Sequence, residues 1–305
     1  MSSPLVIFED FHSPLEKVFL DTVIPENTPG EESIDLALDA LIEHPNTPPF
    51  VSRQLIQRFV TSAPDPDYVE RVANVFIAGQ YQLPSGDIVG DGRRGDLAAT
   101  LAAILFDEDA RSPDTREADE FGKVREPVLR FTNWARAFDA SPIPTGRAVE
   151  IWNTGDPSDL GQHPYKGPSV FNFYRPGYIP PASEVGAAGL TAPEFQIVNS
   201  STIAGYANFM SDFISGQGVN SAAEGLIPDY SEEIALADDA DALVDHLDQL
   251  LAYGTMSDET KETIIGFLEE ISIVDVADPQ DPGRRERAEL AILLVMTSPD
   301  YIIQR

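Results

Sequence analysis

The chain has 305 residues and no cysteine, and its 51 acidic residues against 20 basic ones give a net charge of −31. The absence of cysteine excludes disulfides, thiolate nucleophiles and cysteine-ligated metal sites. The negative charge argues against a nucleic-acid partner, because binding to phosphates depends on Lys and Arg, and the sequence contains no run of eighteen apolar residues that would predict a transmembrane segment.

Residues 1–30 are interrupted by prolines and predict an irregular segment with one short helix at 15–20. Apolar residues then recur at helical spacing and predict a helix at 31–43. The stripe of this helix that we expect to face the core consists of Ile34, Leu38, Leu41 and Ile42.

A second helix is predicted at residues 47–60, because Thr47 is suited to cap a helix and Pro48 fits its first position. One face of this helix is apolar and the other carries arginines and glutamines. We expect the apolar face to pack on neighbouring helices.

An Asp-Pro pair at residues 65–66 repeats this start signal for a third helix, which extends to residue 76. Residues 79–95 are rich in Gly, Asp and Pro and predict a loop. Asp96 then caps a helix at 97–106 that is apolar nearly all round, so we expect it to be buried.

After a charged stretch at 107–122, Glu126 and Pro127 predict the start of a helix that extends to residue 138. From 141 to 181 the helical periodicity disappears and aromatic residues, Pro and Gly dominate, which predicts a long irregular segment.

Residues 191–194 match a capping box and predict a long helix to residue 214, with a bend near 200–202. The last helices are predicted at 231–237, 239–253, 257–273 and 284–297, followed by a short turn at 298–299. No strand pattern of any length appears.

The predicted fold is therefore all-α, an irregular multi-helix bundle with long loops. We predict a main helical domain at residues 1–215, which includes the aromatic loop at 141–181. An acidic helical subdomain at 216–305 is expected to pack on it.

Six segments stand out as motifs. They are, in chain order, HPNTPPFVSRQLIQRFVTS, GDLAATLAAILFDEDAR, GKVREPVLRFTNWARAF, GPSVFNFYRPGYIP, APEFQIVNSSTIAGYANF and LLVMTSPDYIIQR. In this order they resemble the bacterial family called domain of unknown function 1800, and the chain is similar to the C-terminal portion of such proteins.

The resemblance implies a periplasmic or extracellular protein, since members are thought to act mostly outside the cytoplasm and are often encoded beside exported alkaline-phosphatase-like proteins. The chain itself begins without the features of an export signal. The resemblance supplies no catalytic residues. The polar members of the matching motifs are Arg53, Arg58, Arg125, Glu126, Arg130, Asn172 and Glu194.

Together with Arg136, these arginines lie on the polar faces of two predicted helices, and Glu126 and Glu194 are available as partners. Guanidinium groups bind sulfate, phosphate or carboxylate through paired hydrogen bonds, so these residues are candidates for ligand binding. The alternative is a structural network of ion pairs that ties the helices together.

The aromatic loop adds Trp152, Phe171 and Tyr174 to the predicted ligand-binding residues, with Asn172 between the last two. Aromatic side chains with polar tips suit a sugar or another planar ligand. Equally, these rings could anchor the irregular segment to the core.

No zinc-binding H-E-x-x-H, nucleophile elbow or phosphate-binding glycine motif occurs, so the sequence implies no metal and no cofactor. Residues 87–96 resemble a calcium loop only weakly, because its third and twelfth positions lack acidic residues. The paired acids of the last third fit solvated helix faces, with cation or basic-partner binding as the alternative.

The leading hypothesis is an extracytoplasmic helical binding or assembly protein that holds an exported partner protein or a polysaccharide. One alternative is a hydrolase or lyase acting on a polyanionic or carbohydrate substrate, in which Arg125 or Arg130 binds the anion and Glu126 or Glu194 is the acid or base. A second alternative is a structural subunit of an envelope or filament assembly.

Overall fold

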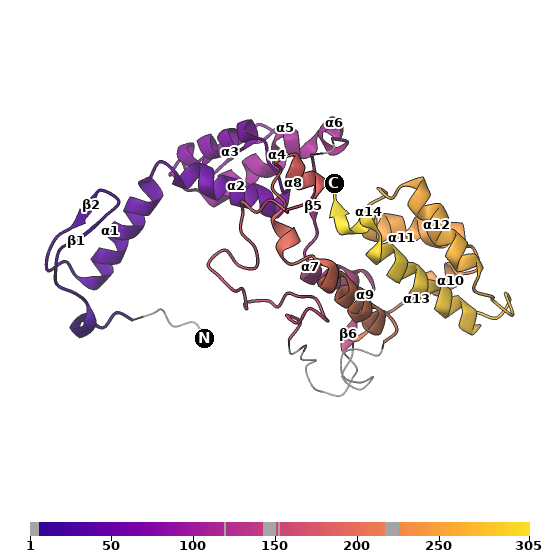
Figure 1. The fold of residues 1–305 in the computed structure, drawn as a ribbon. Coiled ribbons are helices and arrows are strands. Elements are labelled where there is room, and N and C mark those ends of the chain that lie inside the picture. Colours follow the sequence, from indigo (N-terminus) through magenta and orange to yellow (C-terminus); the bar gives the residue numbers. More distant parts are fainter. Residues whose placement is uncertain (1–5, 119, 143–150, 152, 217–225) are drawn as a thin grey trace. The chain divides into compact units, whose positions relative to one another are not determined.

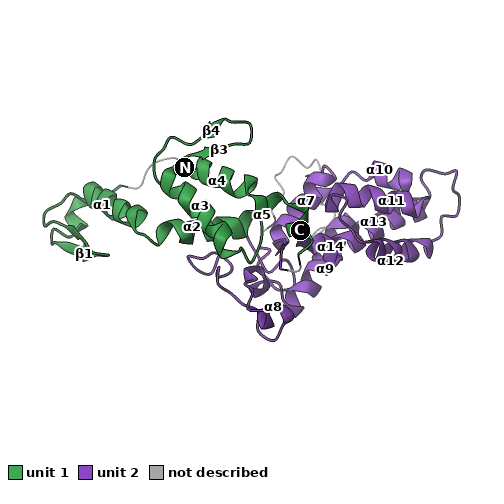
Figure 2. Cartoon of the chain, turned by 90° about the horizontal axis from the view of Figure 1, so that it is seen from above, with its two compact units in different colours: residues 1–118 green, residues 119–305 purple. Residues whose placement is uncertain are grey.

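Two compact units, which divide after Ala118, make up the chain (Figure 2). The structure, a computed structural model, describes residues 6–118, 120–142, 151, 153–216 and 226–305. Unit 1 comprises residues 1–118 and unit 2 comprises residues 119–305. The domain boundary that the sequence predicts at residue 216 is a different division and stays a prediction.

Unit 1 is built mainly of helices and carries two short antiparallel strand pairs, β1 with β2 and β3 with β4 (Figure 1). Its described elements are a 3-10 turn (Glu9–Phe11), β1 (Lys17–Phe19), β2 (Thr22–Ile24), α1 (Gly30–Glu43), α2 (Thr47–Phe59), α3 (Pro66–Ala78), β3 (Tyr81–Gln82), β4 (Ile88–Val89), α4 (Leu97–Phe106), α5 (Glu108–Arg111) and α6 (Pro113–Arg116).

The core of unit 1 lies where α2, α3 and α4 pack on one another. Ile56, Val72 and Ile104 contribute one fully buried side chain from each of these helices. Tyr68 is also buried, and its hydroxyl donates to the carbonyl oxygen of Ile104 at 2.7 Å. The helix starts predicted at Asp65 and Asp96 are confirmed, because both carboxylates accept amide hydrogens of the first turn.

The N-terminal arm, by which we mean residues 6–44, contains the β1–β2 hairpin and α1. The helix predicted at 15–20 is wrong, because β1 and a tight turn occupy these residues. Leu20 and Asp21 both have positive φ, 46° and 61°, as a two-residue hairpin turn requires. Arg94 holds the C-terminal end of the arm by donating to the carbonyl oxygen of Ile42 at 2.8 Å.

The predicted orientation of α1 is also wrong. Its apolar stripe is exposed rather than buried, at 40–54% for Ile34, Leu38, Leu41 and Ile42. The buried residues of α1 are instead Gly30 and Ser33. Small side chains at these positions leave room for the segment that packs on them, since a Cβ at Gly30 would lie 2.6 Å from the Ile7 side chain.

Unit 2 is also mainly helical and carries two further antiparallel strand pairs, β5 with β8 and β6 with β7. Its described elements are β5 (Lys123–Val124), α7 (Pro127–Ala137), β6 (Ser141–Pro142), α8 (Glu184–Ala187), a 3-10 turn (Pro193–Gln196), α9 (Ser200–Ile214), β7 (Leu226–Ile227), α10 (Ser231–Leu236), α11 (Ala240–Leu247), a π-helical turn (Asp248–Ala252), α12 (Asp258–Glu269), α13 (Pro282–Thr297), α14 (Pro299–Ile302) and β8 (Ile303–Gln304).

The core of unit 2 joins α7 and α9 to α10–α14. Phe131 and Phe213 pack edge to face with ring centroids 4.8 Å apart, and Phe138 packs in the same way on Tyr230 at 4.9 Å. Trp134 is fully buried and donates its indole N–H to the hydroxyl of Tyr230 at 2.9 Å. One continuous core thus joins residues before and after position 216.

Two further predictions need correction. The capping box lies not at 191–194 but at the start of α9, where Asn199 accepts the amides of Ser201 and Thr202 and Thr202 returns a hydrogen bond. The predicted bend near 200–202 is therefore the beginning of the helix. The described chain is largely helical, as predicted, but its short strand pairs make it not purely all-α.

Candidate functional site

Two arginines at the start of α7 are positioned by contacts with distant parts of unit 2. Arg125 follows β5, and its amide donates to the carbonyl oxygen of Ile302 at 2.8 Å, which extends the pairing of β5 with β8. Its guanidinium donates to the carbonyl oxygen of Leu251 at 3.1 Å. The same guanidinium lies over the rings of Tyr301 and Tyr253, at 4.7 and 5.5 Å from their centroids.

Arg130 lies one turn further along α7 and is 1% exposed. Its Nε donates to the carbonyl oxygen of Arg125 at 2.8 Å, and its guanidinium lies 4.6 Å from the centroid of the Tyr206 ring. Its Nη2 is buried and has no hydrogen-bond partner among the described residues. Burial lowers the pKa of Arg130, and the neighbouring tyrosines oppose this shift.

Neither arginine has a carboxylate as an ion-pair partner within the described residues. Their acceptors are backbone carbonyl oxygens, and their flat faces lie on tyrosine rings. Removing a charge from water without an opposite charge is costly, and aromatic faces return only part of that cost. We call Arg125, Arg130, Tyr206, Tyr253 and Tyr301 the arginine–tyrosine cluster.

Two tyrosines of this cluster, Tyr206 and Tyr301, donate hydrogen bonds to oxygen acceptors. Tyr301 is fully buried, and its hydroxyl donates to Asn133 Oδ1 at 3.0 Å and lies 3.3 Å from the carbonyl oxygen of Arg130. Tyr206 donates to the carbonyl oxygen of Met296 at 3.1 Å. Burial raises the pKa of Tyr301 to about 12, against the opposing effect of the two arginines, and burial also raises the pKa of Tyr206.

Glu126 follows Arg125 directly in the chain but belongs to a different network. Its Oε1 accepts the hydroxyl of Tyr174 at 2.7 Å, and its Oε2 accepts the side-chain amide of Gln162. Gln162 Oε1 in turn accepts the amide of Val128 in the first turn of α7 at 3.1 Å. These bonds tie the aromatic loop to the start of α7.

The aromatic loop is anchored by one of its predicted rings. Tyr174 is buried and packs with Val124 and Ile197. Phe171 is half-buried, and Asn172 is exposed with a φ of 66°. Trp152 lies outside the described residues. For Tyr174, the arrangement favours the anchoring role over the presentation of a ring to a ligand.

Glu194 sits in the 3-10 turn Pro193–Gln196 and is 0% exposed. Its carbonyl oxygen accepts the amides of Ile197 and Val198 at 3.1 and 3.0 Å, which tightens the turn before α9. Such a carboxylate is part of the interior of unit 2 rather than of its surface.

Arg53 and Arg58 are the two predicted site residues in unit 1. Arg53 is exposed on α2, and Arg58 near the end of this helix is half-buried. The other predicted residues belong to unit 2, so the single site formed by all of the arginines stays a prediction.

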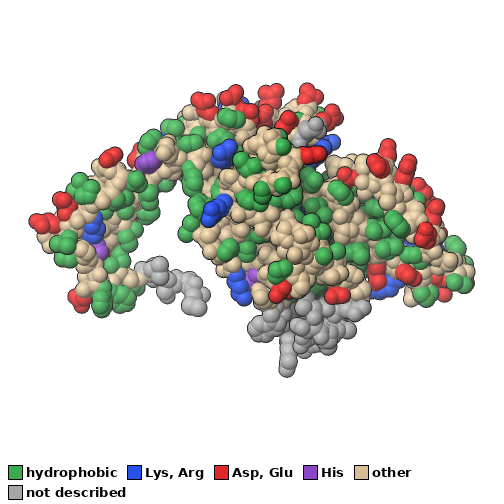
Figure 3. Space-filling view, viewed as in Figure 1, with side chains coloured by type: hydrophobic (Ala, Val, Ile, Leu, Met, Phe, Trp, Pro, Cys, Tyr) green, Lys and Arg blue, Asp and Glu red, His purple; other side chains and the backbone are tan. Residues whose placement is uncertain are grey.

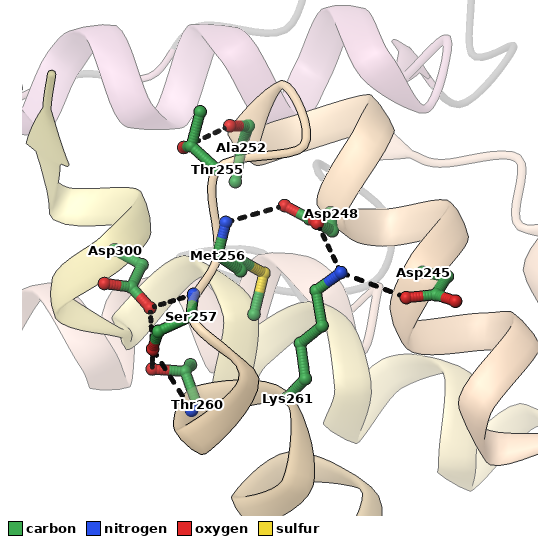
Figure 4. Close-up of polar contacts among 9 residues, drawn as sticks. All are labelled: Asp245, Asp248, Ala252, Thr255, Met256, Ser257, Thr260, Lys261 and Asp300. Atoms are coloured by element: carbon green, nitrogen blue, oxygen red, sulfur yellow. Dashed lines mark hydrogen bonds and ion pairs between the residues drawn. The ribbon is translucent and has the colours of Figure 1, made fainter. Parts of the chain in front are cut away.

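Lys261 is an example of a cation whose charge is paired with carboxylates of the chain itself (Figure 4). Its Nζ lies 2.7 Å from Asp248 Oδ2 and 3.0 Å from Asp245 Oδ1, and these bonds raise its pKa. Asp248 also accepts the amide of Met256 at 3.0 Å. This network fastens the π-helical turn to α12. Within the part of the chain that the structure describes, Arg125 and Arg130 have no such carboxylates, which sets them apart as candidates for binding a ligand.

The three tyrosines of the arginine–tyrosine cluster are not among the site residues predicted from the sequence. Tyr206 and Tyr301 are members of the fifth and sixth motifs quoted above, so these motifs carried a signal for them. Tyr253 lies outside the motifs and is placed by a left-handed backbone conformation, with a φ of 60°, after the π-helical turn.

The described residues lack two kinds of feature. None of their helices combines the length and hydropathy needed to cross a bilayer. No three or more of their His, Asp or Glu side chains are grouped so that they could hold a metal ion.

Comparisons with known proteins place the chain in a family. No curated protein and no solved structure matches it. The sequence profile of a family described as a protein of unknown function (DUF1800) matches residues 3–303, which is nearly the whole chain. The chain therefore belongs to the DUF1800 family.

Proposed function

We propose that this protein is a binding protein that holds an acidic polysaccharide, and that the arginine–tyrosine cluster receives a carboxylate or sulfate group of the ligand. The observation that carries the proposal is that no carboxylate among the described residues pairs with Arg125 or Arg130. The chain has 51 acidic residues, so carboxylates that could pair with a cation are plentiful, and Lys261 pairs with one of them at 2.7 Å. An anionic ligand would supply the missing charge through charge-assisted hydrogen bonds.

The side chains next to the two arginines support a polysaccharide as the class of ligand. Tyr253 is 69% exposed beside Arg125, so a ring face with a polar tip and a cation lie together at the accessible side of the cluster. Sugar rings stack on such faces while their charged groups reach a guanidinium. The net charge of −31 repels anions at long range, but at physiological salt this repulsion is screened beyond about 8 Å.

Binding fits this geometry better than catalysis does. A general acid or base must reach the proton that it transfers. Glu126 already accepts hydrogen bonds from Tyr174 and Gln162, and Glu194 is fully buried. The hydrolase or lyase alternative would therefore require the half-buried Glu126 to give up these hydrogen bonds, or Glu194 to become exposed. The extracytoplasmic location stays a prediction.

Isothermal titration calorimetry with a polyuronate oligosaccharide at 150 mM salt, and with a neutral glucan oligosaccharide of equal length, tests this proposal. Replacement Arg125→Ala should weaken polyuronate binding by about 10- to 100-fold, because hydrogen bonds to charged groups contribute about 1.5–3 kcal/mol. Arg136→Ala is the matched control, since Arg136 is exposed on the same helix. Equal affinity for both oligosaccharides, or unchanged binding by Arg125→Ala, would show the proposal to be wrong.

A further inference from the structure

The N-terminal arm carries an apolar surface that no other described part of unit 1 covers. Its stripe on α1 consists of Ile34, Leu38, Leu41 and Ile42, which are 40–54% exposed. At 100° per residue these positions fall within one third of the helix circumference. Figure 3 shows apolar side chains on the surface of this arm, with acidic side chains at its edge.

A hollow next to the stripe adds depth to this surface. The hollow has a volume of about 440 Å³ and an apolar lining that includes Phe19 and Ile24 from the hairpin and Ile34 and Ala37 from α1. Lys17 also lines the hollow, but its Nζ donates to the carbonyl oxygens of Ser13 and Leu15 at 3.0 and 3.3 Å. An apolar side chain of a partner is therefore the group that fits this hollow.

The charge around the stripe identifies the chemistry of the partner. Residues 6–44 contain ten acidic residues and one lysine, Lys17. Glu31, Asp35 and Asp39, all exposed, follow one another at four-residue spacing and form a row along one edge of the stripe. A second copy of this arm would bring like charges together, which costs free energy at an interface. A partner with Lys or Arg beside its apolar residues would instead be complementary.

We propose that the N-terminal arm is the docking surface for an amphipathic helix of another protein, with basic residues flanking its apolar face. Leu and Ile anchors at helical spacing would pack along the stripe, as in other helix-in-groove complexes. One anchor would enter the hollow between the hairpin and α1. The basic flanks would pair with Glu31, Asp35 and Asp39.

Fluorescence anisotropy on the full chain at 150 mM salt tests this inference with two labelled model peptides. Both are 18-residue amphipathic helices with the same Leu face, and one carries Lys and the other Glu on its flanks. We expect the Lys peptide to bind at least 10-fold more tightly than the Glu peptide. Leu38→Gln should weaken its binding at least 10-fold, whereas Phe267→Gln, a matched change at an exposed apolar residue of α12, should not.

Leu38→Gln and Phe267→Gln leave the charge of the chain unchanged. They therefore distinguish docking on the stripe from a general electrostatic attraction of the Lys peptide to an acidic protein. Equal binding of the Lys peptide by Leu38→Gln and the unchanged protein would overturn the proposal, as would no binding of either peptide. Sedimentation velocity tests whether a second copy of the chain occupies the surface instead. A dimer that Leu38→Gln dissociates would assign the surface to a second copy. Binding to phosphatidylcholine vesicles that Leu38→Gln abolishes would assign it to a membrane, and this too would overturn the proposal.

Discussion

The half-buried Lys261 and the buried Arg130 are stabilised in two different ways. Lys261 has two carboxylates within 3.0 Å, so its charge is compensated inside unit 2. Arg130 is 1% exposed, and its Nη2 has no hydrogen-bond partner among the described residues. Its Nε donates to a backbone carbonyl oxygen, and its guanidinium lies over the ring of Tyr206. An uncompensated buried charge lowers stability, and such a residue is characteristic of a site that gives up stability for binding.

Replacing Arg130 by an apolar side chain of similar length should therefore stabilise the protein and impair binding. We expect Arg130→Met to raise the free energy of unfolding by about 1 kcal/mol, because burying a charge costs more than its few hydrogen bonds return. The same change should weaken polyuronate binding. Urea denaturation and calorimetry measure the two effects.

The exposed Arg136 on the same helix is again the control, and Arg136→Met should leave both quantities unchanged. If Arg130→Met lowered the free energy of unfolding by more than about 2 kcal/mol, the prediction would be wrong and the guanidinium would be a net stabilising group. Removing one partner of a buried ion pair typically costs about 3 kcal/mol or more.

Individual helices begin where local hydrogen bonds satisfy their first amides, and the predicted cap residues differ in whether they supply such bonds. Asp96 accepts the amide of Ala99 at 2.9 Å through Oδ1 and the amide of Asp91 at 3.2 Å through Oδ2. Thr47 does not cap α2 as predicted, because its hydroxyl donates to the carbonyl oxygen of Leu41 at 2.5 Å. Only residues 44–46 separate α1 from α2, so the last carbonyls of α1 compete for this hydroxyl.

Removing the cap of α4 should destabilise unit 1 by a predictable amount. Asp96→Ala is expected to cost about 1 kcal/mol, because the first-turn amides of α4 lose their acceptor. Asp96→Asn should recover most of this loss, since it retains a side-chain oxygen. Asp67→Ala is the control, because Asp67 is exposed in the first turn of α3 and is not its cap. Urea denaturation that finds Asp96→Ala equal to Asp67→Ala would contradict a capping role.

Across the whole molecule, burial affects tyrosines in both units in the same direction. Burial raises the pKa of Tyr68 in unit 1 and of Tyr206, Tyr230 and Tyr301 in unit 2, and for Tyr301 the pKa reaches about 12. In the unfolded chain these groups have a pKa of about 10. The native state therefore retains protons that the unfolded state loses at high pH.

Stability should consequently fall at alkaline pH. The stabilisation from a raised pKa is fully present below pH 10 and is lost as the pH rises through the native pKa, at about 1.4 kcal/mol per pH unit for each tyrosine. We expect the urea midpoint to decline between pH 10 and 12, and the absorbance of tyrosinate at 295 nm to rise steeply at unfolding. Tyr301→Phe should make the decline shallower. A constant urea midpoint across this range would contradict the expectation.

The sequence by itself determined the helical character, most helix starts and the family. Caps such as Asp65 and Asp96 act within one helical turn, so the local sequence contains the information that specifies them. The six motifs likewise identified the family that the match to residues 3–303 shows. The sequence also identified Arg125 and Arg130 as candidate ligand-binding residues, because both lie in the third motif.

Only the tertiary structure decided which faces are covered and which side chains meet. The stripe on α1 has the spacing of a core face, yet it is exposed because the segment around Ile7 packs on the side of Gly30 instead. The short strand pairs were missed because each joins only two or three residues, too few for a periodic pattern. The arginine–tyrosine cluster unites residues from 125 to 301, and contacts across such separations depend on packing rather than on local sequence.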